Sequence, residues 1–180
     1  RAVRFKESDV TAVGRNSVGV RGIKVRESEV IGMEIVDAPY LLTITEKGYG
    51  KRSEVNDYRL ISRGGSGVTN IKITEKNGDV VGVKIVDDND EIMLISKNGV
   101  VIRTPVNGIS VIGRNTQGVK IINLEEGDSL STIARIINEE NLDTKKELKP
   151  SEDSANEEKE VDTTEEKPSK IDFTLEGYEE

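Results

Sequence analysis

The stretch Gly113-Arg114-Asn115-Thr116-Gln117-Gly118-Val119-Lys120-Ile121-Ile122-Asn123-Leu124 decides the fold of this chain. It is a polar turn between glycines that carries one arginine and leads into a β-branched run. Segments 14–25 and 62–73 repeat this plan, and their arginines are Arg15 and Arg63. Arg63 lies 48 positions after Arg15, and Arg114 lies 51 positions after Arg63, which is the spacing of a repeat array.

Each repeat contains short runs of β-forming residues separated by turn residues, such as Asn77-Gly78 and Asn98-Gly99. An Asn-Gly pair between two such runs indicates a β-hairpin, because a type I′ turn needs positive φ at both central residues. We therefore expect each repeat to fold as an antiparallel meander of four strands. The expected strands are 20–25, 29–36, 40–45 and 50–53 in the first unit, 68–73, 79–86, 91–96 and 100–104 in the second, and 118–124 and 132–137 in the third.

A four-stranded unit of about 50 residues has the size of a propeller blade. One blade cannot bury both of its faces, so it needs neighbours stacked around an axis. Fewer than three complete units are visible, whereas closed propellers have at least four blades. The sequence therefore predicts an all-β, partial propeller that starts in the middle of a blade. Aromatic residues are few and tryptophan is absent, so we expect a core of Val, Ile and Leu.

The charge divides the chain into two parts. Residues 139–180 hold 16 acidic and 6 basic side chains, a net charge of −10. Residues 1–138 keep 18 acidic and 20 basic side chains, a net charge of +2. We expect a mildly basic body over 1–138 and an acidic, disordered tail over 139–180, which has little to bury. A short helix over 129–142 is an alternative to the strand expected at 132–137. The apolar segment 171–178 is either a docking motif or a remnant of the tail.

The chain has no cysteine and no histidine, so disulfides, thiolate zinc sites and histidine-based catalysis are excluded. No triad arrangement is visible, and no apolar run approaches membrane-spanning length. Asp87-Asp88-Asn89-Asp90-Glu91 lacks the spacing of a calcium-binding loop, so we interpret it as a solvated hairpin turn. The glycine-rich segment 62–67 precedes a strand and lacks the Walker lysine, which argues against a nucleotide site.

Basic residues recur in register along the repeats. The columns are Arg4, Arg52 and Arg103; Arg15, Arg63 and Arg114; Arg21 and Lys120; and Lys24 and Lys72. If each unit is a blade, each column lies at one height and the columns form a basic track along the curved rim. Such a track suits bent duplex DNA bound through its phosphates, because the body lacks the aromatic platforms typical of single-strand binding. The alternative is that these are ordinary surface cations balanced by nearby acids.

The segment 113–120, followed by Leu124-Glu125-Glu126-Gly127-Asp128, closely resembles the last blades of the C-terminal domain family of the DNA gyrase A subunit. The resemblance covers about residues 1–137. It implies a six-bladed β-pinwheel, of which this chain holds roughly the last three blades. In that family duplex DNA wraps around a basic perimeter, which presents a DNA segment for ATP-dependent strand passage and negative supercoiling.

The resemblance also implies what lies elsewhere. The catalytic tyrosine belongs to an N-terminal breakage-reunion domain of the same polypeptide, and ATP and Mg²⁺ are used by other domains within an A2B2 complex with the gyrase B protein. No residue here inherits a catalytic role, no cofactor is expected in this fragment, and a cytoplasmic, nucleoid-associated location without a membrane is implied. In the family, acidic tails compete with DNA for the rim.

Two alternatives stay open. The gyrase box of the family is not intact here, and its nearest counterpart, 61–67, lacks the glutamine and two cations. The C-terminal domain of the topoisomerase IV A subunit therefore remains possible. A propeller that serves protein–protein contacts, with the acidic tail as its binding segment, is the second alternative.

Overall fold

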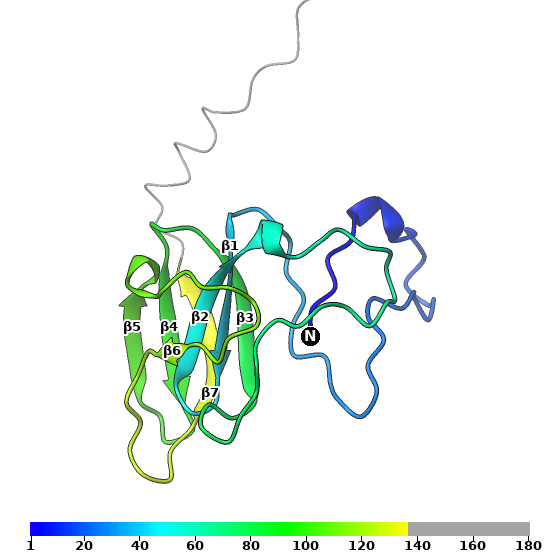
Figure 1. Cartoon of the computed structure of the whole chain (residues 1–180). Coiled ribbons are helices and arrows are strands. Elements are labelled where there is room, and N and C mark those ends of the chain that lie inside the picture. The colour runs from blue at the N-terminus through cyan, green and yellow to red at the C-terminus, as the bar shows by residue number, and fades with distance from the viewer. Residues whose placement is uncertain (137–180) are drawn as a thin grey trace, which may run out of the picture.

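The computed structural model describes residues 1–136, and the tail predicted over 139–180 lies outside the described residues. Seven strands and three short 3₁₀ helices make up its regular structure (Figure 1). In chain order they are η1 (Glu7–Asp9), β1 (Tyr40–Thr45), β2 (Tyr49–Glu54), η2 (Val55–Asp57), β3 (Val80–Val86), β4 (Glu91–Ser96), β5 (Val101–Pro105), η3 (Val106–Gly108), β6 (Val119–Lys120) and β7 (Leu130–Ile136). The described residues contain no α-helix, so the all-β prediction is confirmed. None of the described helices is long and apolar enough to cross a membrane.

The strands form two antiparallel sheets. One sheet has the order β3-β1-β2-β6, and the other has the order β5-β4-β7. In both sheets a hairpin, β1–β2 or β4–β5, receives a strand of the next repeat, β3 or β7, against its first strand. In the four-stranded sheet β6 then pairs with β2, with Tyr49 opposite Lys120.

The prediction of a meander within each repeat is wrong, because each sheet draws its strands from successive repeats. β1 and β2 come from the first repeat, β3 from the second and β6 from the third. Segments 20–25, 29–36 and 68–73, which were expected as strands, form no ladder in the described structure, and only Val68 makes an isolated bridge, to Ala2. By repeat spacing, segment 29–36 is equivalent to β3. Strand β3 pairs with the β1–β2 hairpin of the preceding repeat. The described structure contains no equivalent hairpin with which segment 29–36 could pair.

The two sheets share one hydrophobic core. Its buried members are all Val, Ile or Leu, which confirms the expected core composition: Leu42, Ile44, Val86, Ile92, Leu94, Val106, Ile109, Ile122, Leu130 and Ile133. The sheets approach most closely where β3 meets β7, since a methyl group added at Gly82 would lie 2.7 Å from the side chain of Ile133. A side chain at this position would force Ile133 to shift. Segment 130–136 is strand β7, so the competing helix is wrong over these residues.

The hairpin turns differ in detail from the expected type. The Gly99 N–H donates to the Ser96 carbonyl oxygen at 3.2 Å, and Gly99 has φ of 86°. The turn therefore has Lys97 and Asn98 at its centre, one residue earlier than a type I′ turn on Asn98-Gly99. Segment 87–91 is also not a hairpin turn, because it joins β3 and β4, which lie in different sheets. The Asp90 carboxylate is 6% exposed and pairs with the Arg135 guanidinium at 2.8 Å.

Candidate nucleic-acid interface

Arg63 and Arg114 hold neighbouring repeats together in the same way. The Arg63 guanidinium donates to the Arg21 carbonyl oxygen at 2.6 Å, and the Arg114 guanidinium donates to the Thr69 carbonyl oxygen at 2.8 Å. Arg21 and Thr69 are themselves repeat-equivalent, 48 positions apart. The Arg114 guanidinium also lies 5.7 Å from the ring centroid of Tyr58. Both side chains are half-buried, so each arginine divides its hydrogen-bonding groups between the neighbouring repeat and solvent.

Arg4 and Arg52 are used within the fold. The Arg4 guanidinium donates to the carbonyl oxygens of Val55 and Tyr58 at 3.1 and 3.3 Å. The Arg52 guanidinium donates to the Ile109 carbonyl oxygen at 2.8 Å, pairs with Asp88, and is only 5% exposed. Since these groups are engaged inside the molecule, the interface proposed below is built without Arg4 and Arg52.

Arg103, the third member of that column, lies in a different environment. Its side chain is 57% exposed and its guanidinium Nε donates to the Glu91 carboxylate at 2.9 Å across the β4–β5 pair. The structure therefore separates three positions that the sequence treats as one column.

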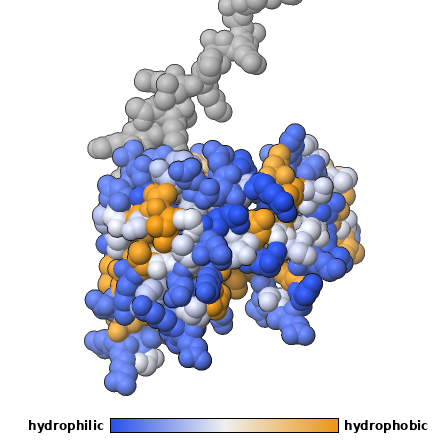
Figure 2. All heavy atoms as spheres, in the orientation of Figure 1, coloured by the Kyte–Doolittle hydropathy of each residue, from blue (hydrophilic) through white to orange (hydrophobic). Residues whose placement is uncertain are grey.

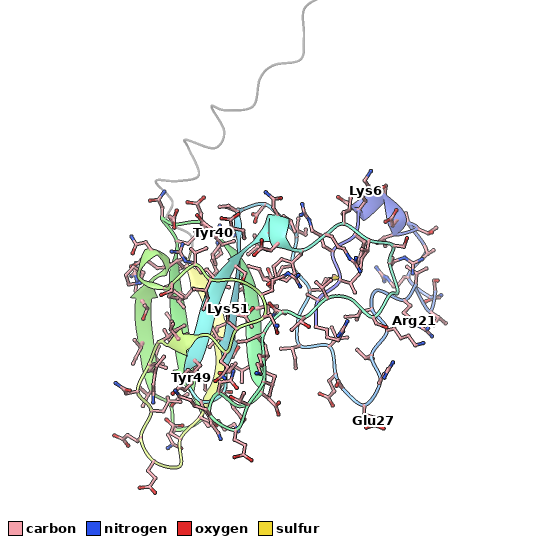
Figure 3. The ribbon with its side chains drawn as sticks, in the orientation of Figure 1. Lys6, Arg21, Glu27, Tyr40, Tyr49 and Lys51 are labelled. Carbon is pink, nitrogen blue, oxygen red and sulfur yellow. The ribbon has the colours of Figure 1, made fainter. Side chains whose placement is uncertain are left out.

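Besides Arg103, five of the predicted basic residues are exposed: Arg15, Arg21, Lys24, Lys72 and Lys120. Two of them have matching backbone environments, because the Lys24 N–H donates to the Gly65 carbonyl oxygen and the Lys72 N–H donates to the Thr116 carbonyl oxygen, both at 2.9 Å. Lys24 and Lys72 are therefore exposed at equivalent positions of successive repeats. In Figure 3 Arg21 lies far from the sheets, in the irregular part built from residues 1–39 and 55–79, while Tyr49 lies at one end of β2.

Asn77 ties Lys72 to the turn of the third repeat. Its buried side chain donates to the carbonyl oxygens of Lys72 and Gln117 at 2.9 and 3.0 Å, and accepts from the Thr74 N–H at 2.7 Å. A buried amide with its groups satisfied in this way rigidifies the backbone around it. The backbone that carries Lys72 is therefore held against the segment 113–118.

Lys76 belongs to the same basic surface and was missed from the sequence. Its ammonium lies 5.4 Å from the ring centroid of Tyr49, and the Lys120 ammonium lies 5.6 Å from the same centroid. Both distances are within the range of cation–π attraction. Lys76 falls in none of the repeat columns. Its place on the basic surface is recognised only from its contact with Tyr49 in the fold. The face in Figure 2 is mostly hydrophilic, with small apolar patches between the polar groups.

Lys51 is the second residue that sequence reasoning missed. Its side chain is fully buried, and its ammonium donates to the carbonyl oxygens of Gly113 and Arg114, both at 2.8 Å (Figure 3). Burial, and to a lesser extent the neighbouring Arg114, lowers the pKa of Lys51 to about 8, against a smaller opposing effect of Asp57. Burial disfavours the charged form of an amine, which explains the direction. The repeat-equivalent residues, Val3 and Ile102, carry no charge, so no column marks this position.

The described residues form no group of three or more His, Cys, Asp or Glu side chains that could hold a metal ion. The exposed basic groups above are the candidate functional groups of the described surface. Cations of this kind, presented from a curved array of repeats, can bind a polyanion through its charge.

Comparisons with known proteins identify the family of the chain. The family model "DNA gyrase C-terminal domain, beta-propeller" matches residues 1–37, 39–87 and 90–137. The DNA gyrase A subunit of Escherichia coli (strain K12) is 47% identical over 149 residues, which cover 80% of this chain and 17% of the relative. The DNA gyrase A subunit of Staphylococcus aureus (strain MRSA252) is 40% identical over 173 residues, which cover 92% of this chain and 19% of the relative. The chain thus spans less than a fifth of the length of these relatives.

Solved structures show the same fold. The structure of a DNA gyrase A C-terminal domain superposes with a TM-score of 0.66 at 32% identity, over 74% of this chain and 46% of that chain. The C-terminal domain of a DNA topoisomerase IV superposes with a TM-score of 0.70 at 21% identity, over 79% of this chain and 46% of that chain, which shows a shared fold only. With the family model matched along nearly the whole described chain, this protein belongs to the DNA gyrase C-terminal domain, β-propeller family.

Proposed function

We propose that this chain binds and bends duplex DNA along the exposed cations that its repeats present. The observation that carries the proposal is the matched placement of Lys24 and Lys72, each exposed and each held by the same main-chain hydrogen bond to the next repeat's turn. Arg21 and Lys120 extend this surface, and Lys76 adjoins it. Together these groups form the candidate rim: Arg15, Arg21, Lys24, Lys72, Lys76 and Lys120.

Physical chemistry supports phosphate contacts without base readout. Lysine and arginine side chains on a surface neutralise phosphates and release counterions, which gives sequence-independent affinity. The described body offers no stacked aromatic platform for single strands, since its three tyrosines lie on or beside the sheets against basic side chains. One duplex can contact several cations on a curved array of repeats only if the duplex bends. The additional phosphate contacts then offset the free-energy cost of bending.

Within the whole protein, this wrapping serves a type IIA DNA topoisomerase of the gyrase kind. The wrapped duplex is presented to the breakage-reunion domain of the same polypeptide, and strand passage uses ATP and Mg²⁺ at domains outside this chain, in an A2B2 assembly with the gyrase B protein in the cytoplasm. The gyrase relatives at 40–47% identity favour gyrase, since the topoisomerase IV structure at 21% identity shares the fold alone. No particular observation favours a module for protein contacts alone.

Duplex binding measured over a range of salt concentrations tests the proposal. The variant carries Arg21→Gln, Lys24→Gln, Lys72→Gln and Lys120→Gln, which removes four exposed positive charges. Each lost phosphate contact lowers the slope of log K against log salt by about 0.9, so the slope should fall by roughly 3 to 4.

A matched control variant removes four exposed cations outside the columns: Lys6→Gln, Arg26→Gln, Arg59→Gln and Lys97→Gln. It has the same net charge as the first variant, and its slope should change little. Equal loss of affinity and slope in the two variants would show that net charge, rather than the candidate rim, determines binding. Absence of duplex binding by the folded wild-type chain at low salt would refute the proposal itself.

A further inference from the structure

Strand β2 holds the segment that leads into the turn of the third repeat through two side chains and one main-chain N–H group. The Ser53 hydroxyl donates to the Ile112 carbonyl oxygen at 2.8 Å, and the Arg52 N–H donates to the Ser110 carbonyl oxygen at 3.0 Å. Lys51 continues the series by donating to the carbonyl oxygens of Gly113 and Arg114. Three consecutive residues of β2 therefore hydrogen-bond to the carbonyl oxygens of segment 110–114.

The position of Lys51 determines where the neighbouring N–H groups point. In a trans peptide the N–H of a residue points opposite to the carbonyl of the residue before it. Because the carbonyls of Gly113 and Arg114 point inward at the Lys51 ammonium, the N–H groups of Arg114 and Asn115 point outward, away from Lys51. Neither N–H group donates a hydrogen bond to any residue in the described part of the chain.

We propose that the Gly113-Arg114-Asn115 turn is an anion site that takes one DNA phosphate on the main-chain N–H groups of Arg114 and Asn115, with Lys51 as the positioning residue beneath it. Successive outward N–H groups form concave sites for anions, and a buried positive charge behind them strengthens the attraction. This inference rests on the proposed function for the identity of its ligand, but its geometry does not depend on that function.

The site is specific to one repeat. The residue equivalent to Lys51 is Val3 one repeat earlier, as the matching bridges Arg4 to Leu60 and Arg52 to Val111 show. Val3 has no donor, so the equivalent turn at Arg63 lacks an ammonium behind it. The Gly64 N–H, equivalent to that of Asn115, already donates to the Gly22 carbonyl oxygen at 2.7 Å, so only the Arg63 amide serves as an internal control for the Arg114 amide.

Phosphate binding at this site should be linked to the proton on Lys51. The titratable and charged groups that face the Lys51 ammonium are Arg114 from the turn itself and Asp57 from η2, with Tyr58 beside both. A phosphate above the turn adds a negative charge that favours the protonated amine, which raises its pKa from about 8. If that rise is about one unit, duplex affinity falls roughly five- to tenfold between pH 7 and pH 9.5.

The experiment compares duplex affinity at pH 7 and pH 9.5 for the wild-type chain, for Lys51→Met and for Lys72→Gln. Methionine keeps the length of the lysine stem but carries no charge. We expect the wild-type chain and Lys72→Gln to lose affinity with rising pH by the same factor, and Lys51→Met to lose much less. An equal pH dependence in all three proteins would overturn the inference and leave the proposed function intact.

A second measurement does not depend on the variant or on duplex binding. Amide chemical shifts of the wild-type chain are followed at pH 6.5 during titration with inorganic phosphate. Shifts at the amides of Arg114 and Asn115, with the Arg114 shift larger than that of the equivalent Arg63 amide, would support the site even if duplex binding failed. Unchanged Arg114 and Asn115 amides would refute it, whatever the result with DNA.

Discussion

Replacement of Arg52 by methionine tests whether the buried arginine stabilises the fold. Arg52→Met removes a charged hydrogen bond of 2.8 Å to the Ile109 carbonyl oxygen, a longer one of 3.4 Å to Asn107, the ion pair with Asp88 and the contact with the Tyr40 ring at 4.8 Å. A hydrogen bond to a charged group contributes about 1.5–3 kcal/mol, and a buried carbonyl left without a donor costs about 1–3 kcal/mol.

Asp88 limits the total cost. Its side chain is 56% exposed, so water solvates the carboxylate once its partner is gone, and no charge is left buried. Ile109 is only 3% exposed, so its carbonyl has little access to water. We therefore expect Arg52→Met to lower the free energy of unfolding by about 3–4 kcal/mol.

Urea denaturation followed by circular dichroism measures this loss. Arg103→Met is the matched control, because Arg103 occupies the equivalent position but is exposed and paired only with Glu91, and its midpoint should stay close to that of the wild-type chain. A loss below about 1 kcal/mol for Arg52→Met, or equal losses in both variants, would refute the assignment. Reduced duplex affinity in a stable Arg52→Met protein would instead make Arg52 a DNA contact.

Two further predictions concern the backbone and the buried amine. Gly118→Ala should lower the free energy of unfolding by about 2 kcal/mol or more, because Gly118 has φ of 81° and the added methyl would lie 2.7 Å from the Gly50 carbonyl oxygen. Gly99→Ala, at φ of 86° with open space around it, should cost only about 1 kcal/mol in the same denaturation assay, and equal costs would contradict the close approach. The pKa of Lys51 is lowered to about 8 in the folded chain, so above pH 8 the unfolded chain binds more protons than the folded chain. Between pH 7 and pH 9.5 the free energy of unfolding of the wild-type chain should therefore rise by about 2 kcal/mol relative to that of Lys51→Met. Burial raises the pKa of Tyr58, which opposes this gain only near and above pH 10, and parallel pH curves for the two proteins would refute the role of Lys51.

Local signals in the sequence predicted the β1–β2 and β4–β5 hairpins, whereas Asn77-Gly78 and segment 87–91, also expected as hairpin turns, join no hairpin. Strands expected at 40–45 and 91–96 coincide with β1 and β4, because β-branched runs followed by a glycine turn determine both within a few residues. Segments 20–25, 29–36 and 68–73 have similar composition but form no strand here. A strand exists only with a partner, and the partners of these segments belong to other repeats, which no local pattern reveals.

The candidate site was predicted only in part for a related reason. The repeat spacing identifies Arg52 and Arg103 as equivalent, yet one guanidinium is buried on carbonyl oxygens and the other is exposed. The buried guanidinium donates to the carbonyl oxygens of Asn107 and Ile109 in the following repeat, whereas Arg103 pairs with Glu91 of its own hairpin. Lys51 was missed because its chemistry comes from contact with a turn more than sixty positions away, and the residues equivalent to it are apolar.

The exchange of strands among repeats has a consequence for how the chain folds during synthesis. Lys120 pairs with Tyr49, which the ribosome adds 71 residues earlier. At a synthesis rate of roughly 5–20 residues per second, β6 is made about 4–14 s after β2. During that interval Lys51, Arg52 and Ser53 lack the carbonyls that satisfy them in the native sheet. These polar side chains keep the waiting edge hydrated, which protects the nascent chain from pairing with other strands.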